Sequence, residues 1–270
     1  MTLPDRTYGN VYYPETDGEP MAETDTHRDI MMDLISELTE FYKDNPIVYV
    51  SGNLLLYYRE GDPKKSLSPD VFVVKGIEKK KRPIYKLWEE GKMPDVVIEI
   101  TSKTTRHEDL RNKKGLYEVL GVKEYFIFDP FSEYLNPNLK GYRRTGDKFH
   151  PIQGRIISEI LGLELIVEEE SLRLGEIFSR KKLLTPRETA RAKEEAEVAL
   201  LQAETKLIQK ETQLLEKETH LMQVETKRVE AEAKALEAEQ ARNEERAARE
   251  KLEEEVTRLR EVLHSSGIEV

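Results

Sequence analysis

The chain has 270 residues, of which 43 are Lys or Arg and 53 are Asp or Glu, so its formal charge is −10. It contains no Cys, which excludes disulfides, thiolate metal sites and cysteine nucleophiles. No apolar run reaches the ~18 residues of a membrane span, and the start lacks the apolar segment of a signal peptide, so we expect a cytoplasmic protein.

The first part of the chain contains the aromatic and β-branched residues that a folded core requires. An apolar stripe predicts a helix over 27–43 with Thr26 as its cap, and a second helix is expected over about 106–120, ended by Gly121. Strands are expected at 47–50, 54–58, 71–74, 96–100 and 125–128. From about 138 to 184 only short hairpin-like segments are expected, for example 163–167. This order predicts an α/β fold, a mixed β-sheet core flanked by helices.

The composition changes sharply at Pro186. Beyond this residue there is no further Pro, no Asp, no aromatic residue, and no Gly before Gly267. Ala, Glu, Lys, Arg, Leu and Gln predominate there, and all are good helix formers. We therefore divide the chain into a folded domain (1–185), a long helix (186–264) and a short tail (265–270).

The long helix has a seven-residue repeat. Glu204, Glu211 and Glu218 begin a row of glutamates seven residues apart, and Ile208 and Leu215 begin an apolar row with the same step. This period is typical of a coiled coil. The opposing core position is mostly Thr, and the leucines after 251 follow in a shifted register. The pattern favours a helix for self-association or for a partner helix over a solvated single helix held by Glu–Lys pairs.

Two carboxylates occupy unusual places in the predicted strands. Asp70 directly precedes a β-branched strand, and Glu99 lies between Ile98 and Ile100. A buried carboxylate is costly unless it is paired or binds a metal ion. If the two strands are neighbours, both acids can hold one hard cation such as Mg²⁺. The alternatives are a turn role for Asp70 and an exposed edge-strand position for Glu99.

Asp95 is a competing ligand, because it lies on the same strand face as Glu99. Four residues of extended chain separate the two by ~13 Å, so they cannot easily share one ion. We therefore expect a turn role for Asp95.

Three blocks of sequence together resemble one protein family. They are Ser68-Pro69-Asp70 before a β-branched strand, the block 94–102 that contains Glu99, and the block 109–130 with Lys113, Tyr117 and Gly121. In order and spacing these resemble the Uma-two family of restriction endonucleases, within the PD-(D/E)XK nuclease superfamily. The likeness covers most of residues 10–185, and a Glu-rich helical tail is also seen in that family.

The resemblance implies a restriction-endonuclease-like fold and metal-dependent cleavage of DNA. It assigns Asp70 and Glu99 as ligands of the divalent ion. The usual superfamily lysine lies two residues beyond the second acid, where this chain has Thr101. In this family the lysine is displaced to the next helix, which points to Lys113, with Lys114 and the more remote Lys103 as alternatives. Such an ammonium can orient water or offset charge in the transition state.

Other residues are weaker candidates. The basic run 79–82 can contact a phosphate backbone or be a solvated loop, and Tyr85 and Trp88 can stack on bases but more plausibly anchor that loop. His107 has no second histidine at ligand spacing, so we expect a surface position. The helix over 27–43 contributes Glu37 and Glu40, and nothing in the sequence singles out either.

The leading hypothesis is therefore a Mg²⁺- or Mn²⁺-dependent DNA endonuclease with Asp70, Glu99 and Lys113 in its site. RNA remains an alternative substrate, because the metal chemistry is the same. The competing hypothesis is a nuclease-like scaffold or binding module that acts through its coiled coil. Self-association through the helix would bring two sites together for a double-strand cut.

Overall fold

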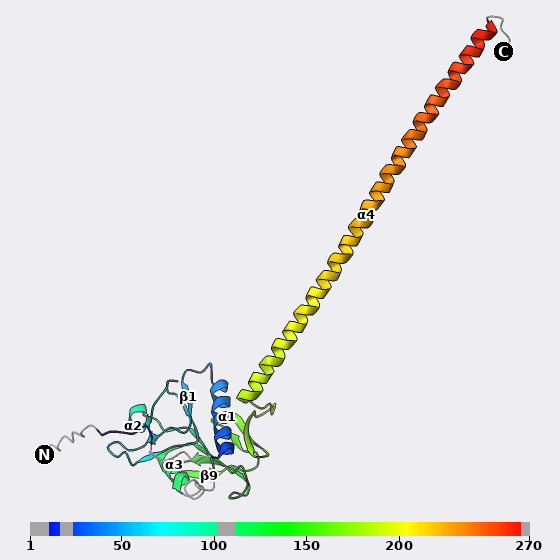
Figure 1. Cartoon of the computed structure of the whole chain (residues 1–270). Coiled ribbons are helices and arrows are strands. Elements are labelled where there is room, and N and C mark those ends of the chain that lie inside the picture. The colour runs from blue at the N-terminus through cyan, green and yellow to red at the C-terminus, as the bar shows by residue number, and fades with distance from the viewer. Residues whose placement is uncertain (1–10, 17–23, 102–111, 266–270) are drawn as a thin grey trace, which may run out of the picture. The chain divides into compact units, whose positions relative to one another are not determined.

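A computed structural model describes residues 11–16, 24–101 and 112–265 of the chain (Figure 1). The chain divides into two compact units, residues 1–193 and residues 194–270. The helices are α1 (Asp25–Phe41), α2 (Leu87–Glu90), α3 (Lys114–Leu120) and α4 (Pro186–Ser265). No helix in the described part of the chain is long and apolar enough to cross a membrane.

The main sheet has six strands in the order β1-β4-β6-β7-β8-β9. Its strands are β1 (Val48–Ser51), β4 (Val71–Lys75), β6 (Val96–Ile100), β7 (Glu124–Phe128), β8 (Leu139–Thr145) and β9 (Lys148–Pro151). The central pair β6 and β7 is parallel, and the other pairs are antiparallel. The mixed sheet flanked by helices is thus confirmed, and β4 and β6 are neighbours in it.

Alternate residues of the central strands face two separate hydrophobic clusters. The first face packs against α1 and a three-stranded sheet of β10 (Ile157–Ser158), β11 (Leu163–Glu168) and β12 (Ser171–Glu176). The second face packs against Tyr117 of α3 and a small sheet of β2 (Leu56–Tyr57), β3 (Ser66–Leu67) and β5 (Tyr85–Lys86). Because both faces are covered, the central strands read as nearly continuous apolar runs.

The boundaries differ from the sequence prediction in two places. Helix α1 begins earlier than expected, and its cap is Thr24, whose side-chain oxygen accepts a hydrogen bond from the backbone N–H of His27. Thr26 is therefore not the cap. The hairpin of β8 and β9 lies within the range 138–184, where short hairpin-like segments are expected, but the sequence does not delimit its two strands. The predicted end of α3 is confirmed, since Gly121 lies in the left-handed region with φ 90°, and the part of that predicted helix before Asn112 lies outside the described residues.

Helix α4 begins with a reciprocal cap. The backbone N–H of Glu188 donates to Thr185 Oγ1, and the backbone N–H of Thr185 donates to Glu188 Oε2. Pro186 occupies the first helical position, where no N–H is needed. Arg173 of β12 forms ion pairs with Glu188 in the first turn of α4, at 2.6 Å, and with the buried Glu37 of α1, at 3.1 Å. The first turn of α4 is thus held by the first unit.

We expect Glu37 to make folding stability depend on pH. Burial raises the pKa of Glu37 from its usual 4.5 to about 7, because the attraction of Arg173, which is shared with Glu188, only partly offsets desolvation. Between these values the folded chain keeps a proton that the unfolded chain releases, so the free energy of unfolding falls as pH rises from about 4.5 to 7.

The variant Glu37→Gln should remove this contribution, which is on the order of 2–3 kcal/mol. The measurement is urea unfolding followed by the fluorescence of Trp88, the only Trp in the chain. If the variant retains the full wild-type dependence of the free energy of unfolding on pH, Glu37 is not its source.

Candidate active site

Asp70 and Glu99 lie opposite each other on neighbouring strands. Strands β4 and β6 pair with Val71 opposite Ile98, and one further step of the same register sets Asp70 opposite Glu99. Directly opposed residues of an antiparallel pair share one face of the sheet, with Cβ atoms about 4.5–5.5 Å apart. This is the face that also carries Phe72 and Val97, and α3 covers it.

Asp70 is held by two groups from different elements. The backbone N–H of Ile100 donates to Asp70 Oδ2 at 2.7 Å, and Nε2 of His27 on α1 lies 3.2 Å from the same oxygen. His27 is buried, and Asp70 is nearly so. The carboxylate therefore has a fixed position at the end of β4, with His27 as its side-chain neighbour.

Glu99 is fully buried in the centre of the sheet. The edge-strand alternative is thus wrong, because β4 and β7 flank its strand. Tyr117 donates its hydroxyl to Glu99 Oε1 at 2.6 Å, and Lys113 Nζ lies 3.3 Å from Glu99 Oε2. Burial, and next the negative charge of Glu99, raise the pKa of Tyr117 well above its usual value, so the phenol remains a donor.

The two adjacent lysines differ in direction. Lys113 points to Glu99, whereas Lys114 Nζ lies 3.9 Å from the ring centroid of Tyr142 in a cation–π contact. The structure thus brings Asp70, Glu99 and Lys113 together and places Lys114 away from them. Lys103 and His107 lie outside the described residues.

The residues present fit a hard divalent cation. Asp70 and Glu99 supply carboxylate oxygens, and no larger cluster of His, Asp or Glu suited to a metal occurs in the described ranges. Mg²⁺ is commonly held by one or two carboxylates, with water and substrate phosphate as the remaining ligands. Thr101 has a buried hydroxyl with no hydrogen-bond partner among the described residues, and it lies on the same strand face as Glu99. The donor set therefore suits an ion that keeps part of its water shell.

The competing acids lie elsewhere. Asp95 stands at the opposite end of β6, where it accepts a hydrogen bond from the backbone N–H of Lys75 and contacts Lys92 and Lys123. Burial acts to raise its pKa, but the hydrogen bonds, chiefly that of Lys123, lower it overall. Glu37 is paired with Arg173, and Glu40 with Lys43 on the surface. These acids have structural partners and do not join the site.

The basic run 79–82 is partly used for structure. Arg82 forms an ion pair with Glu90 at 2.7 Å and lies 4.3 Å from the ring centroid of Tyr49. Tyr85 is fully buried and donates to the backbone oxygen of Lys92. Tyr85 therefore anchors the loop and is not a stacking surface for bases. Lys80 and Lys81 remain exposed.

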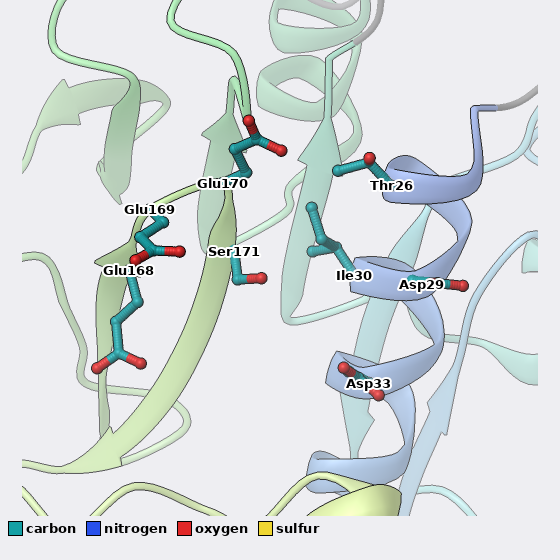
Figure 2. Close-up of a pocket in the computed structure, with 8 residues that line it drawn as sticks. All are labelled: Thr26, Asp29, Ile30, Asp33, Glu168, Glu169, Glu170 and Ser171. Atoms are coloured by element: carbon teal, nitrogen blue, oxygen red, sulfur yellow. The ribbon is translucent and has the colours of Figure 1, made fainter.

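A separate pocket on the first unit is strongly acidic. Figure 2 shows the turn between β11 and β12 facing the first half of α1, and the pocket is lined by Thr26, Asp29, Ile30, Asp33, Glu168, Glu169, Glu170 and Ser171. Burial raises the pKa of Asp33 there. The residues that line the pocket include no Lys or Arg, so its charge disfavours contact with a phosphate backbone.

Two residues of the site were not assigned from the sequence. Tyr117 follows Lys113 by four residues, the spacing that sets two side chains on one helical face, so this signal was present. His27 is 43 positions before Asp70 in the chain, and no spacing rule links them. Only the packing of α1 against the sheet brings them together.

Comparisons with known proteins show the family of the chain. The family model Uma2, described as "Putative restriction endonuclease", matches residues 3–168. Five chains of solved structures match, among them a structure from Anabaena variabilis ATCC 29413 titled "a putative nuclease belonging to DUF820". It is 18% identical, covers 58% of this chain and 82% of its own, and has a TM-score of 0.34. No curated protein matches. Since the family model spans more than half of the sequence, the chain belongs to the Uma2 family.

Proposed function

We propose that this protein is a divalent-metal-dependent endonuclease that hydrolyses phosphodiester bonds in DNA. The observation that carries the proposal is the buried pair Asp70 and Glu99 with Lys113 3.3 Å from the second acid. A strand in the middle of a sheet gains no stability from a buried glutamate. Membership in a family described as restriction endonucleases supports the same activity.

Asp70 and Glu99 are the residues that would hold the ion. When bound, Mg²⁺ or Mn²⁺ supplies Lewis-acid stabilisation of the phosphate and a more acidic water. The hydrogen bond from Ile100 and the contact with His27 orient Asp70. Metal-binding carboxylates are commonly oriented by hydrogen bonds of this kind. Tyr117 likewise orients Glu99. His27 and Tyr117 are thus positioning residues.

Lys113 is the proposed catalytic cation. In the reaction a water oxygen forms a bond to phosphorus and gives up a proton, the bond from phosphorus to one deoxyribose oxygen breaks, and that oxygen leaves with a proton. The ammonium of Lys113, placed beside Glu99, would orient the water or offset negative charge that develops on the phosphate. Lys113, the residue before α3, contacts Glu99, whereas Lys114 is directed to Tyr142.

The adjacent lysines provide a matched test of this role. With supercoiled plasmid and Mg²⁺ or Mn²⁺, we expect Lys113→Ala to lower the cleavage rate by about 10²-fold, the usual loss for one charge-stabilising group. Lys114→Ala should retain most of the wild-type rate, because it removes only a cation–π contact. The reverse order of the two rates would move the catalytic role to Lys114. Full activity in both variants would exclude both lysines from the catalytic role.

A further inference from the structure

Helix α4 exposes large apolar side chains along its length. Leu207, Leu214 and Leu221 keep roughly 60% of their surface exposed, as do Leu252 and Leu259 near the other end. Figure 1 shows α4 as one unbroken helix. Most helical stability in proteins comes from packing of an apolar face rather than from helix propensity. The exposed apolar rows are therefore a candidate surface for a partner, and the sequence indicates which one.

One heptad register runs through the helix without a break. The row that starts at Leu200 continues through Leu207 and Leu214 and reaches Val256 in whole heptads, while the row three residues later starts at Ala203 and reaches Leu259. Two rows three residues apart are the a and d positions of a coiled coil. The leucines after 251 are thus in phase with these rows. These leucines are out of phase only with the apolar row that contains Ile208 and Leu215.

The charges beside these rows fit a second copy of the helix. In a parallel pair in register, each g residue faces the e residue five positions later in the partner. The charged pairs formed this way are Lys206–Glu211, Lys227–Glu232, Lys234–Glu239 and Glu255–Arg260. All four are of opposite sign, and no like-charged g–e pair occurs between residues 199 and 260. The g and e rows are therefore complementary in a parallel pair.

The alternative seams are repulsive. If Thr205 and Ile208 set the a and d rows, the same rule yields like-charged pairs at 211–216, 225–230, 232–237, 239–244 and 246–251, and only one pair of opposite sign, at 253–258. In an antiparallel pair, e faces e, and the e row of the first register is glutamate at every position from Glu204 to Glu239. The charges at e and g thus favour one seam and one direction.

We infer that α4 pairs with α4 of a second copy, parallel and in register, along the seam from Leu200 to Leu259. This inference rests on the helix alone and does not depend on the proposed nuclease activity. Six positions of the seam are charged: Arg228, Arg242 and Arg249 at a, and Lys210, Lys217 and Glu245 at d. Polar residues at such positions fix register and oligomeric state at a cost in stability. The pairing sets the Glu194 residues of both copies at the same end of the coil.

Adjacent residues supply a matched test of the seam. In sedimentation of the full chain at tens of micromolar, wild type should have twice the monomer mass. The double variant Leu207→Glu, Leu214→Glu should fall to the monomer mass, because it places acids at a positions. The double variant Ile208→Glu, Leu215→Glu makes the same change one residue later, at b positions, and should remain a dimer. A monomeric wild type, or the opposite behaviour of the two variants, would overturn the inference.

Spin labels test the direction of the pair. Because the chain has no Cys, Thr205→Cys and Glu254→Cys each provide one label on the outer face of the coil. In the parallel dimer both labels should show a distance within about 35 Å between copies, since each helix is about 10–12 Å wide. In any antiparallel pair at least one label lies beyond about 70 Å from its copy, given a rise of 1.5 Å per residue. That long distance would refute parallel pairing.

Discussion

Replacing Glu99 by glutamine is expected to abolish both DNA cleavage and the stabilisation of the folded protein by Mg²⁺ or Mn²⁺. The change keeps the shape of the side chain and its contact with Tyr117, but removes the charge that a cation requires. For wild type at a metal concentration of 100 times Kd, binding should add about 2.7 kcal/mol to the free energy of unfolding. Differential scanning fluorimetry with and without the metal measures this as a rise in Tm.

The same experiment has an internal control. Asp95→Asn alters a buried acid of the same strand whose partners are Lys75, Lys92 and Lys123, at the opposite end of β6. This variant should lower the baseline Tm and leave the metal-induced rise unchanged. If Glu99→Gln kept the full metal-induced rise in Tm while Asp95→Asn lost it, the ion would bind at the Asp95 end of β6. That result would contradict the proposed site.

Gly52→Ala is expected to destabilise the first unit severely and to disturb the site. A Cβ atom at residue 52 would lie 2.0 Å from the backbone oxygen of Asp70 and 2.6 Å from Ile35 Cδ1. The backbone oxygen cannot move without shifting the start of β4, where Asp70 is held. We expect a loss of about 3 kcal/mol or more in the free energy of unfolding, at the upper end for overpacked positions. Urea unfolding followed by Trp88 fluorescence measures it.

Gly115→Ala is the matched control for this substitution. Gly115 lies in α3 between Lys113 and Tyr117, and a Cβ atom there would meet no atom within 4 Å. Alanine should stabilise the helix by up to about 1 kcal/mol. Equal and small effects of both substitutions would show that residue 52 has more space than the structure indicates.

The sequence predicts the elements with strong apolar patterns. The strands that become β4, β6 and β7 were identified because both faces of each are buried, which produces runs such as Val71–Val74. The same logic drew attention to Glu99, a charged residue inside such a run. The strands of the hairpin β8 and β9 could not be delimited within 138–184, because β8 contains Lys140, Arg143 and Arg144, and its buried positions include a glycine.

That glycine has a packing reason. A Cβ atom at Gly141 would lie 2.9 Å from the ring of Phe126 on the neighbouring strand, so the position excludes the apolar side chain that would have revealed the alternation. His27 could not be predicted for a different reason. Its contact with Asp70 spans 43 residues and depends on how α1 packs on the sheet, which local periodicity does not encode.

The decisive experiment is cleavage of supercoiled plasmid by the wild-type chain. We expect nicked or linear DNA in the presence of Mg²⁺ or Mn²⁺, and none after chelation with EDTA or with Asp70→Asn and Glu99→Gln. Cleavage that persists at the wild-type rate in the Asp70→Asn and Glu99→Gln variants would contradict the proposed function. So would a folded wild type that neither cleaves DNA nor gains stability from either metal, and the scaffold hypothesis would then be the better one.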